Sequence, residues 1–355
     1  MKNKSKYWTF LTGLITVLLI LINSCNKEDQ KEIQLPTVTT DLVTDISSTS
    51  AICKGNVLSD GGYQTVNRGI YWSNITTLPG HNDNYQWEGW GTGSFSCLMD
   101  YLIPGTTYYV RAYAINTAGT SYGKVIQFST TGSLVGDIVF NQDLMYGLLT
   151  DIVGNTYKTI KIGTQTWMAE NLKTTKYKDG TDIPNITNST EWINLSTPGY
   201  CWYLNDVNKY KNIYGALYNW YVLNTGKVCP AGWHVPSNLE WTTLTTYLGG
   251  DRVADSKLKE TGTTHWINTY TGVTNSSGFT AMPAGNCWGV KTEPLTYFGD
   301  LGYAGHFWST SEYNDSINGF YGVYSRTFIG GFEEYTNQTF TKTQGLSIRC
   351  IQDSI

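Results

Sequence analysis

The chain has 355 residues, a formal net charge of −4 and an aromatic content of 14%. This length suggests two or three domains. The many aromatic residues and the low charged content, 15%, exclude a disordered chain, and the composition is not that of a coiled coil. Because no basic excess is available to neutralise phosphates, the charge argues against nucleic acid as a partner. Abundant Tyr, Trp, Thr, Asn and Gly predict β-structure with many turns.

Residues 1–24 have the pattern of a secretory signal peptide. Three lysines among the first six residues precede an apolar run at 7–22, which is shorter than the roughly 20 residues of a membrane span. The run ends just before Cys25 and resembles the lipobox of bacterial lipoproteins, from which Asn23 departs. The resemblance implies that Cys25 is lipidated and becomes the new N-terminus. The alternatives are an ordinary signal peptide with an incidental cysteine, or a lone membrane anchor.

Residues 25–35 form a polar, charged tether. The acidic stretch after Cys25 resembles the surface-export signal of Bacteroidetes lipoproteins. It implies a lipid-anchored outer-membrane protein that faces the cell exterior, and a plain spacer is the alternative. The expected partners are the membrane, through the lipid on Cys25, and a glycan or protein ligand at the surface.

The seven cysteines agree with an address outside the cytoplasm, where disulfides form. With Cys25 lipidated six remain, and sequence alone does not choose among their possible pairings. Division of the chain into two units leaves Cys53 with Cys97 and two further pairs among the other four. For Cys53 and Cys97, two packed thiols are the alternative to a bridge.

Residues 36–131 are predicted to form a first unit, in which short alternating runs are separated by turn residues, as in a β-sandwich. The segment LIPGTTY at 102–108 resembles the tyrosine corner of fibronectin type III domains, and Tyr108 matches the corner tyrosine. The resemblance implies an all-β sandwich that serves as a spacer or docking surface. The expected strands span residues 50–57, 66–72, 95–99, 108–116 and 125–129.

Residues 132–149 are predicted to be a linker that partly packs on a second unit at 150–353. That unit opens with a β-hairpin. We expect a short helix at 214–221, and a later helix that begins at a capping box formed by Ser237 and Glu240. The apolar face of the later helix is expected to comprise Leu239, Leu244, Tyr247 and Leu248.

Five segments of the second unit carry a family resemblance. They are GTQTWMAENL (163–172), YGALYNW (214–220), CPAGWHVP (229–236), FWSTSEY (307–313) and SIRC (347–350). Together they resemble the Fibrobacter succinogenes major paralogous domain over nearly the whole unit. What this family does is poorly defined, so the resemblance identifies the domain better than its function.

A weaker resemblance concerns the fold. The VPSNLEW helix start, the WSTSE segment and the final RC strand look like formylglycine-generating enzymes, whose fold is C-type-lectin-like. The resemblance implies an α+β, loop-rich domain with few helices around small twisted sheets. It also places Cys350 near the loop that holds Cys229. The implied disulfides are Cys229–Cys350 and, less directly, Cys201–Cys287.

Catalysis of the formylglycine-generating kind is not expected. Those enzymes need reactive cysteines or a copper-binding thiol pair near the C-terminus, where this chain has only Cys350. Cys229 and His234 would act as nucleophile and base only if they met in space. The four histidines lack the spacing of a zinc site. We therefore expect no catalytic residues and no cofactor, with an enzyme that uses an unrecognised site as an alternative.

Calcium is a weak candidate ligand, because C-type lectins hold sugar through it. Their Glu-Pro-Asn loop is only half present here, as Glu293 and Pro294. Glu312, Asn314 and Asp315 supply the oxygen ligands that suit calcium. A solvated loop is the alternative.

Aromatic residues gather between residues 288 and 335, interleaved with Gly, Asn, Asp and Thr. This combination suits sugars or protein surfaces. We expect about half of these aromatics to form the core, Trp308 especially. The candidate ligand-binding residues are Trp288, Tyr297, Tyr303, His306, Tyr313, Tyr321 and Tyr324.

The function predicted from the sequence is that of a cell-surface lipoprotein. Its fibronectin-like stalk would present a non-catalytic, lectin-like recognition domain to glycan or protein ligands. The alternative is a structural or assembly component of the cell envelope.

Overall fold

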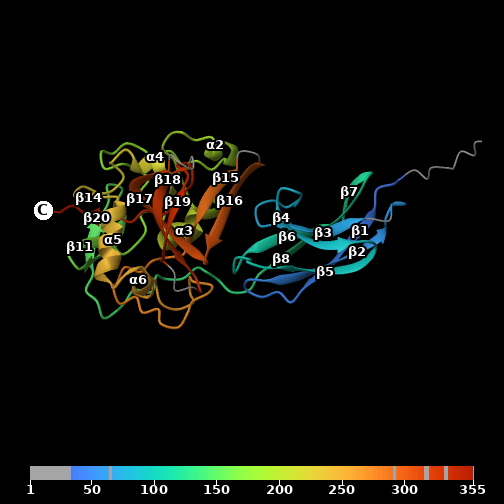
Figure 1. The fold of residues 1–355 in the computed structure, drawn as a ribbon, viewed down its shortest axis with the longest axis horizontal. Helices are drawn as coiled ribbons and strands as arrows, with labels where there is room; N and C mark the ends of the chain where they lie inside the picture. Colours follow the sequence, from blue (N-terminus) through green and yellow to red (C-terminus); the bar gives the residue numbers. More distant parts are fainter. Residues whose placement is uncertain (1–32, 64–65, 291–292, 316–319, 332–334, 355) are drawn as a thin grey trace, which may run out of the picture.

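The computed structural model describes residues 33–63, 66–290, 293–315, 320–331 and 335–354. Figure 1 shows two units in line, the first coloured blue to teal and the second green to red. No helix in these ranges is long and apolar enough to cross a membrane.

The first unit is a sandwich of two β-sheets. One sheet has the strand order β1-β2-β5 and the other β4-β3-β6-β7, with β8 also paired to β6. Alternate residues, such as Ala51, Cys53 and Val57 of β2, are buried between the sheets. The strands are β1 (Thr37–Thr44), β2 (Ala51–Ser59), β3 (Asn67–Ser73), β4 (Asn84–Trp90), β5 (Gly93–Met99), β6 (Thr107–Asn116), β7 (Gly119–Tyr122) and β8 (Ile126–Ser129).

Tyr108 forms the predicted tyrosine corner. The backbone N–H of Ile103 donates a hydrogen bond of 2.9 Å to the Tyr108 hydroxyl, and the buried Tyr108 ring stacks on Phe128. The bond satisfies a backbone donor that would otherwise be buried without a partner. The five expected strands are present, whereas β1, β4 and β7 were not predicted.

The second unit contains two larger sheets and a short strand pair. Their strand orders are β14-β20-β11-β10-β9, β16-β15-β17-β18-β19 and β12-β13. The strands are β9 (Gly147–Thr150), β10 (Thr156–Ile162), β11 (Gln165–Met168), β12 (Tyr200–Cys201), β13 (Leu217–Tyr218), β14 (Trp233–His234), β15 (Ala284–Val290), β16 (Glu293–Leu301), β17 (Ala304–Asp315), β18 (Phe320–Ile329), β19 (Tyr335–Phe340) and β20 (Ile351–Gln352).

Short helices connect these sheets. The predicted capping box is confirmed: the Ser237 hydroxyl accepts from the Glu240 N–H, and the Glu240 carboxylate accepts from the Ser237 N–H. The helices are α2 (Ser189–Ile193), α3 (Val207–Tyr214), α4 (Trp220–Leu223), α5 (Asn238–Tyr247) and α6 (Asp251–Leu258), with a 3-10 turn η1 (Tyr203–Asn205).

One prediction about the helices is wrong and another is correct for only half of its residues. The segment 214–221 is not one helix, because Gly215, with φ of +73°, ends α3 and the next residues pair as β13. The Asn219 side chain then caps α4. Of the residues predicted for the apolar face of α5, Leu244 and Leu248 are buried, whereas Leu239 and Tyr247 are exposed and Trp241 is buried instead.

Aromatic residues dominate the core of the second unit. Trp308 is fully buried, as predicted, and its indole N–H donates to the Tyr218 carbonyl at 2.7 Å. Arg349 is also fully buried, between the rings of Phe279 and Phe307. Its guanidinium donates to the carbonyl oxygens of Met168, Phe279 and Thr280 and to the Asn171 side chain.

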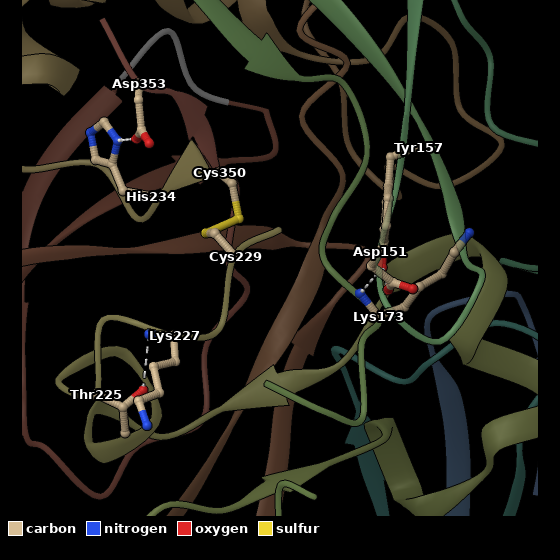
Figure 2. The surroundings of a disulfide bond; sticks show 9 residues. All are labelled: Asp151, Tyr157, Lys173, Thr225, Lys227, Cys229, His234, Cys350 and Asp353. Carbon is tan, nitrogen blue, oxygen red and sulfur yellow. Dashed lines mark hydrogen bonds and ion pairs between the residues drawn. A yellow bond between two sulfur atoms is a disulfide. The ribbon is translucent and has the colours of Figure 1, made fainter. Parts of the chain in front are cut away.

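The predicted Cys229–Cys350 disulfide is present, and Figure 2 shows it beside the pair formed by His234 and Asp353. Cys350 directly precedes β20, which pairs with both β11 and β14. The final strand therefore lies against the opening hairpin of the unit.

The predicted Cys201–Cys287 disulfide is not present. Both residues are buried free thiols that interact with each other, and burial together with Cys201 raises the pKa of Cys287 well above its ordinary value. Cys53 and Cys97 face each other across β2 and β5 as free thiols, and burial raises each pKa to about 12. Because the thiolate is the reactive form, burial keeps Cys53, Cys97 and Cys287 unreactive, and the packed-thiol alternative describes Cys53 and Cys97.

The predicted linker packs on the second unit and continues into it. Its last residues belong to β9, which pairs with β10. Farther upstream, the Tyr214 hydroxyl donates to the Leu134 carbonyl at 2.9 Å, and the Val139 N–H donates to Glu260 at 2.7 Å. Ile103 of the first unit joins the same apolar cluster as Leu134. These contacts set the position of the first unit against the second.

Candidate functional site between the two units

A cleft of about 430 Å³ lies where the two units meet. Its volume is in the range of small-molecule sites, which often lie at domain boundaries. The lining combines aromatic rings with carboxylates and amides, and none of the described residues that line it is basic. The first unit contributes Trp72, Asn74, Asp83, Asn84, Asp100 and Tyr101, and the second contributes Tyr203, Trp288, Phe298, Gly299, Asp300 and Tyr303.

Two tyrosines, one from each unit, meet at this cleft. The ring centroids of Tyr101 and Tyr303 lie 5.7 Å apart, and Tyr101 is 80% exposed. Tyr101 follows β5 in a left-handed conformation, with φ of +57°, which is uncommon outside glycine. Burial, together with nearby Tyr101 and Asp100, raises the pKa of Tyr303 to about 12. The Tyr303 hydroxyl therefore stays protonated at neutral pH and can donate a hydrogen bond.

Tyr303 belongs to the tight turn between β16 and β17. The Tyr303 N–H donates to the Asp300 carbonyl at 2.9 Å, which closes the turn. Asp300 has a φ of +62° and Gly302 a φ of +81°. Left-handed aspartate is tolerated better than most residues, and strained positions of this kind gather at functional sites.

The Asp300 carboxylate is held by buried groups behind it. Asn286 donates to its Oδ2 atom at 2.9 Å, and the Nε2 atom of His306 lies 3.1 Å from the same oxygen. His306 is itself held by the Thr327 hydroxyl, 2.9 Å from its Nδ1 atom. Asp300 remains partly exposed in the cleft while its orientation is fixed. It therefore presents a carboxylate to a ligand in one geometry.

A buried oxygen near this carboxylate lacks a partner. Oδ1 of Asn286 makes no hydrogen bond within the described part of the chain, although Asn286 is buried. Buried polar atoms in folded proteins are normally paired with protein or with water. The polar network behind the cleft therefore retains one unused acceptor.

Trp288 forms part of the cleft wall because of a glycine on the neighbouring strand. Gly299 lies diagonally across the β15–β16 pair, and a Cβ atom there would lie 3.2 Å from Cη2 of Trp288. The absent side chain lets the indole ring lie across β16. A second cavity of about 300 Å³, lined by α2 and η1 residues, shares Asn74, Ile75 and Phe298 with the cleft. The cleft thus extends past Phe298.

The structure brings only some of the predicted binding residues together. Trp288 and Tyr303 line the cleft, and His306 touches it through Asp300. Tyr313 and Tyr324 pack edge to face on each other, 5.4 Å apart, and do not line the cleft. Tyr321 is exposed on β18, and the side chain of Tyr297 lies outside the described residues.

Of the three predicted calcium residues, the structure describes the side chains of Glu312 and Asn314. Glu312 forms an ion pair with Lys342 at 2.7 Å, and Asn314 is exposed. The side chain of Asp315 lies outside the described residues. Within the described ranges, no group of three or more His, Cys, Asp or Glu could hold a metal ion. Because Asp315 is not among the described side chains, the calcium hypothesis stays a prediction.

Sequence reasoning missed the contribution of the first unit to the cleft. Asp100 and Tyr101 directly follow the predicted third strand, in a stretch to which no function was assigned. Asn84 begins a strand that was not predicted. Asp300 stands in the segment FGDLGY, whose two glycines indicate a tight turn. That signal could have drawn attention to Asp300. The local sequence patterns around Asp100 and Asp300 do not, however, predict that the two units come together.

A comparison with known protein families identifies the second unit. The family model of the Fibrobacter succinogenes major domain matches residues 160–352, more than half of the chain. No curated protein matches significantly.

Several solved structures are similar over less than a third of this chain. The sensor domain of the anti-sigma factor RsgI4 from Pseudobacteroides cellulosolvens is 17% identical, with 28% of this chain and 99% of that chain covered and a TM-score of 0.23. A human fibronectin type III domain from KIAA0970 is 12% identical, with 31% and 85% covered and a TM-score of 0.23. Another, from human fibronectin type III domain containing protein 3, is 14% identical, with 30% and 94% covered and a TM-score of 0.21. By its match to the family model, the chain belongs to the Fibrobacter succinogenes major domain family.

Proposed function

We propose that this chain is a non-catalytic recognition protein that binds a neutral glycan in the cleft between its two units. The cleft combines what a sugar needs: aromatic rings against its C–H faces and fixed polar groups for its hydroxyls. The observation that carries the proposal is Asp300, a partly exposed carboxylate in the cleft that His306 and Asn286 hold in one orientation. The absence of basic residues from the described lining argues against an anionic ligand.

The finer fold assignment belongs to the same proposal. We propose that the second unit has a C-type-lectin-like α+β fold. Two features support it: the final strand β20 pairs with β11 of the opening hairpin, and Cys350 beside that strand is bridged to Cys229. The analogy raises the expectation of sugar binding without placing the site.

The proposed location is the outer membrane, with the chain facing outward and held by a lipid on Cys25. Growth with a labelled fatty acid tests the anchor, since wild-type protein should carry the label and Cys25→Ser should not. Protease treatment of intact cells tests the face: digestion supports an external position, and survival of the protein would place it toward the periplasm.

A glycan array with the purified full chain tests the binding function. Any neutral glycan that binds is then titrated calorimetrically against wild type, Asp300→Asn and Tyr303→Ala. The asparagine side chain keeps the shape of the aspartate and tolerates the left-handed backbone, so Asp300→Asn removes the charge and replaces one acceptor oxygen with an NH2 donor. Hydrogen bonds to charged groups contribute about 1.5–3 kcal/mol, so we expect roughly 10- to 100-fold weaker binding.

The matched control is Tyr321→Ala, which removes an exposed tyrosine away from the cleft lining. It should bind like wild type. If Asp300→Asn and Tyr303→Ala both bind the glycan as tightly as wild type, the cleft is not the binding site. A failure of all neutral glycans to bind would favour the alternative of a structural or assembly component, and release of reducing ends during incubation would favour an enzyme.

A further inference from the structure

A second aromatic surface lies on the first unit, away from its core. On β4 all residues except Gly89 are exposed, and three of them carry rings. Tyr85 is 64% exposed, Trp87 47% and Trp90 57%. Such large exposed rings on one short strand usually mark an interaction site.

Strand register extends this surface across the sheet. Tyr71 of β3 pairs with Tyr85, and Tyr113 of β6 pairs with Tyr122 of β7. These rings are on the outer face because the alternate residues, such as Ile70 and Ala112, belong to the core. We call this surface the aromatic face and define it as Tyr71, Tyr85, Trp87, Trp90, Tyr113 and Tyr122.

The aromatic face has buried rings at its centre and exposed rings on the edge strand. Tyr71 and Tyr113 are buried and stack at 4.5 Å, and Tyr71 also contacts Tyr85 and Tyr122 at 6.4 and 6.3 Å. Cross-strand aromatic pairs stabilise sheets, which accounts for these inner contacts. It does not account for Trp87 and Trp90, whose main ring contact is with each other, at 6.1 Å.

A bulge in β4 aligns the two tryptophans. Trp87 pairs with Gly69 and Trp90 with Asn67, so one more residue stands on β4 than on β3 between these pairs. Gly89, with φ of +79°, takes up the extra residue. Bulges of this kind redirect side chains. Here the bulge brings the ring of Trp90 to that of Trp87, in the edge strand of the sheet.

Charge on this surface favours a neutral ligand. The Arg68 guanidinium donates to the carbonyl oxygens of Thr92 and Gly93. Arg111 donates to the Pro79 carbonyl and lies 3.7 Å from the centroid of the Tyr122 ring. The guanidinium N–H groups of both thus already donate to backbone carbonyls, and Arg68 lies over the ring of the core residue Phe95 rather than on the aromatic face. Rings that carry hydroxyl or indole N–H groups remain, and these match the alternating C–H and hydroxyl surfaces of an uncharged sugar chain.

The aromatic face and the cleft meet at the start of β4, on opposite faces of the strand. Asn84, the first residue of the strand, lines the cleft, and Tyr85 follows it directly. Figure 1 shows β4 at the end of the sandwich next to the second unit. Because β4 is an edge strand, a chain of sugars that leaves the cleft at Asn84 can pass around that edge to Tyr85 on the other face and then reach the tryptophans.

We infer that the ligand is an extended neutral polysaccharide, which the cleft holds at one point and the aromatic face holds along its length. The choice of ligand class rests on the proposed function, whereas the surface rests on its own ring contacts and exposure. A polymer that uses both surfaces binds by two linked contacts, so its affinity exceeds that of a short oligosaccharide held by the cleft alone.

The test measures affinity against chain length. Cello-, xylo-, manno- and chito-oligosaccharides, from disaccharide to octasaccharide, are titrated against the full chain and the variant Trp87→Ala/Trp90→Ala. We expect the variant to lose at least about tenfold, or about 1.4 kcal/mol, for the octasaccharide and less than about twofold for the disaccharide. Trp87→Phe/Trp90→Phe keeps the rings and should retain most of the long-chain affinity. Tyr321→Ala, an exposed aromatic elsewhere, should change neither.

The outcomes separate the inference from the proposed function. If disaccharides bind and depend on Asp300, but octasaccharide affinity is the same in wild type and variant, the inference is overturned and the proposed function stands. If no oligosaccharide of any length binds, both fall. If the variant no longer binds a protein from the cell surface but binds every glycan as wild type does, the aromatic face is a protein-docking site and the inference is wrong.

Discussion

The two units expose their tryptophans to different extents. In the second unit, which holds nine of the 13 tryptophans, Trp167, Trp241 and Trp308 are fully buried, and the first two pack at 4.8 Å. In the first unit, Trp87 and Trp90 keep about half of their surface in solvent. The aromatic residues of the family segments are therefore mainly scaffold. Recognition is better sought where the second unit meets the first, and on the first unit itself.

The sharpest test of this contrast compares one tryptophan from each unit. Trp308→Ala should lower the free energy of unfolding of the second unit by about 3–5 kcal/mol, because it leaves a large cavity and removes one of the two hydrogen bonds that the Tyr218 carbonyl accepts. Trp87→Ala should change stability by less than about 1 kcal/mol. Calorimetry of both variants measures the difference. Similar losses in the two would show that the aromatic face is structural.

Removal of the disulfide should also affect the second unit alone. Cys229 and Cys350 are 121 residues apart, so their bond closes a long loop in the unfolded chain. Cys229→Ala/Cys350→Ala should destabilise the unit by about 2–5 kcal/mol. Cys53→Ala/Cys97→Ala is the matched control. A reducing agent should not change the stability of the first unit, with or without these substitutions, because Cys53 and Cys97 are already thiols. A reductant-sensitive transition in the first unit would contradict that assignment.

The sequence predicted local features well where one short segment decides the structure. The tyrosine corner at Tyr108 and the capping box at Ser237 each depend on residues close in the chain. The helix expected at 214–221 failed because distant partners decide it: Leu217 and Tyr218 pair with β12, and Tyr218 also bridges to Leu346. Tertiary pairing overrides local propensity in such cases.

The candidate site was only half predictable for the same reason. Trp288 and Tyr303 could be named because aromatic residues cluster in that segment, but the same rule also selected Tyr313 and Tyr324, which pack on each other elsewhere. Periodicity and composition describe one unit at a time. Asp100 and Tyr101 gain their role only through contact with the second unit, which depends on Ile103 and the packed linker.

A positioning role for His306 can be separated from a structural one. It touches Asp300 through Nε2 and is buried against Phe340. His306→Gln keeps a donor for Asp300 and should weaken glycan binding by less than about threefold. His306→Leu fills similar space without the donor and should weaken it by about tenfold, the loss of roughly one hydrogen bond. Calorimetric titration measures both. Equal affinity in the two variants, at equal stability, would remove His306 from the site.

The smallest expected effect is on the pH dependence of stability, and it comes from His234, which lies outside the cleft. Burial alone would lower the pKa of His234, but hydrogen bonds to Asp353 and Glu240 raise it above its ordinary value of 6.5. A raised folded pKa contributes stability that is fully present below about pH 6.5 and is lost as the pH rises through the folded pKa. Because the imidazole is substantially exposed, solvent screens the pair and the contribution should stay below about 1 kcal/mol.

The second carboxylate in that cluster acts in the opposite direction. The pKa of Glu240 is lowered: burial opposes the shift, but hydrogen bonds from Ser237 and contact with His234 outweigh it. Its contribution is present above about pH 4.5 and is lost as the pH falls through the folded pKa. Stability from the cluster should therefore be greatest between these limits. His234→Gln should flatten the decline above pH 6.5 in denaturant titrations, whereas His81→Gln, at an exposed position in the first unit, should leave it unchanged. If the stability of His234→Gln still declines above pH 6.5, the pH dependence comes from other groups. His234 would then hold the final strand without contributing to the pH dependence.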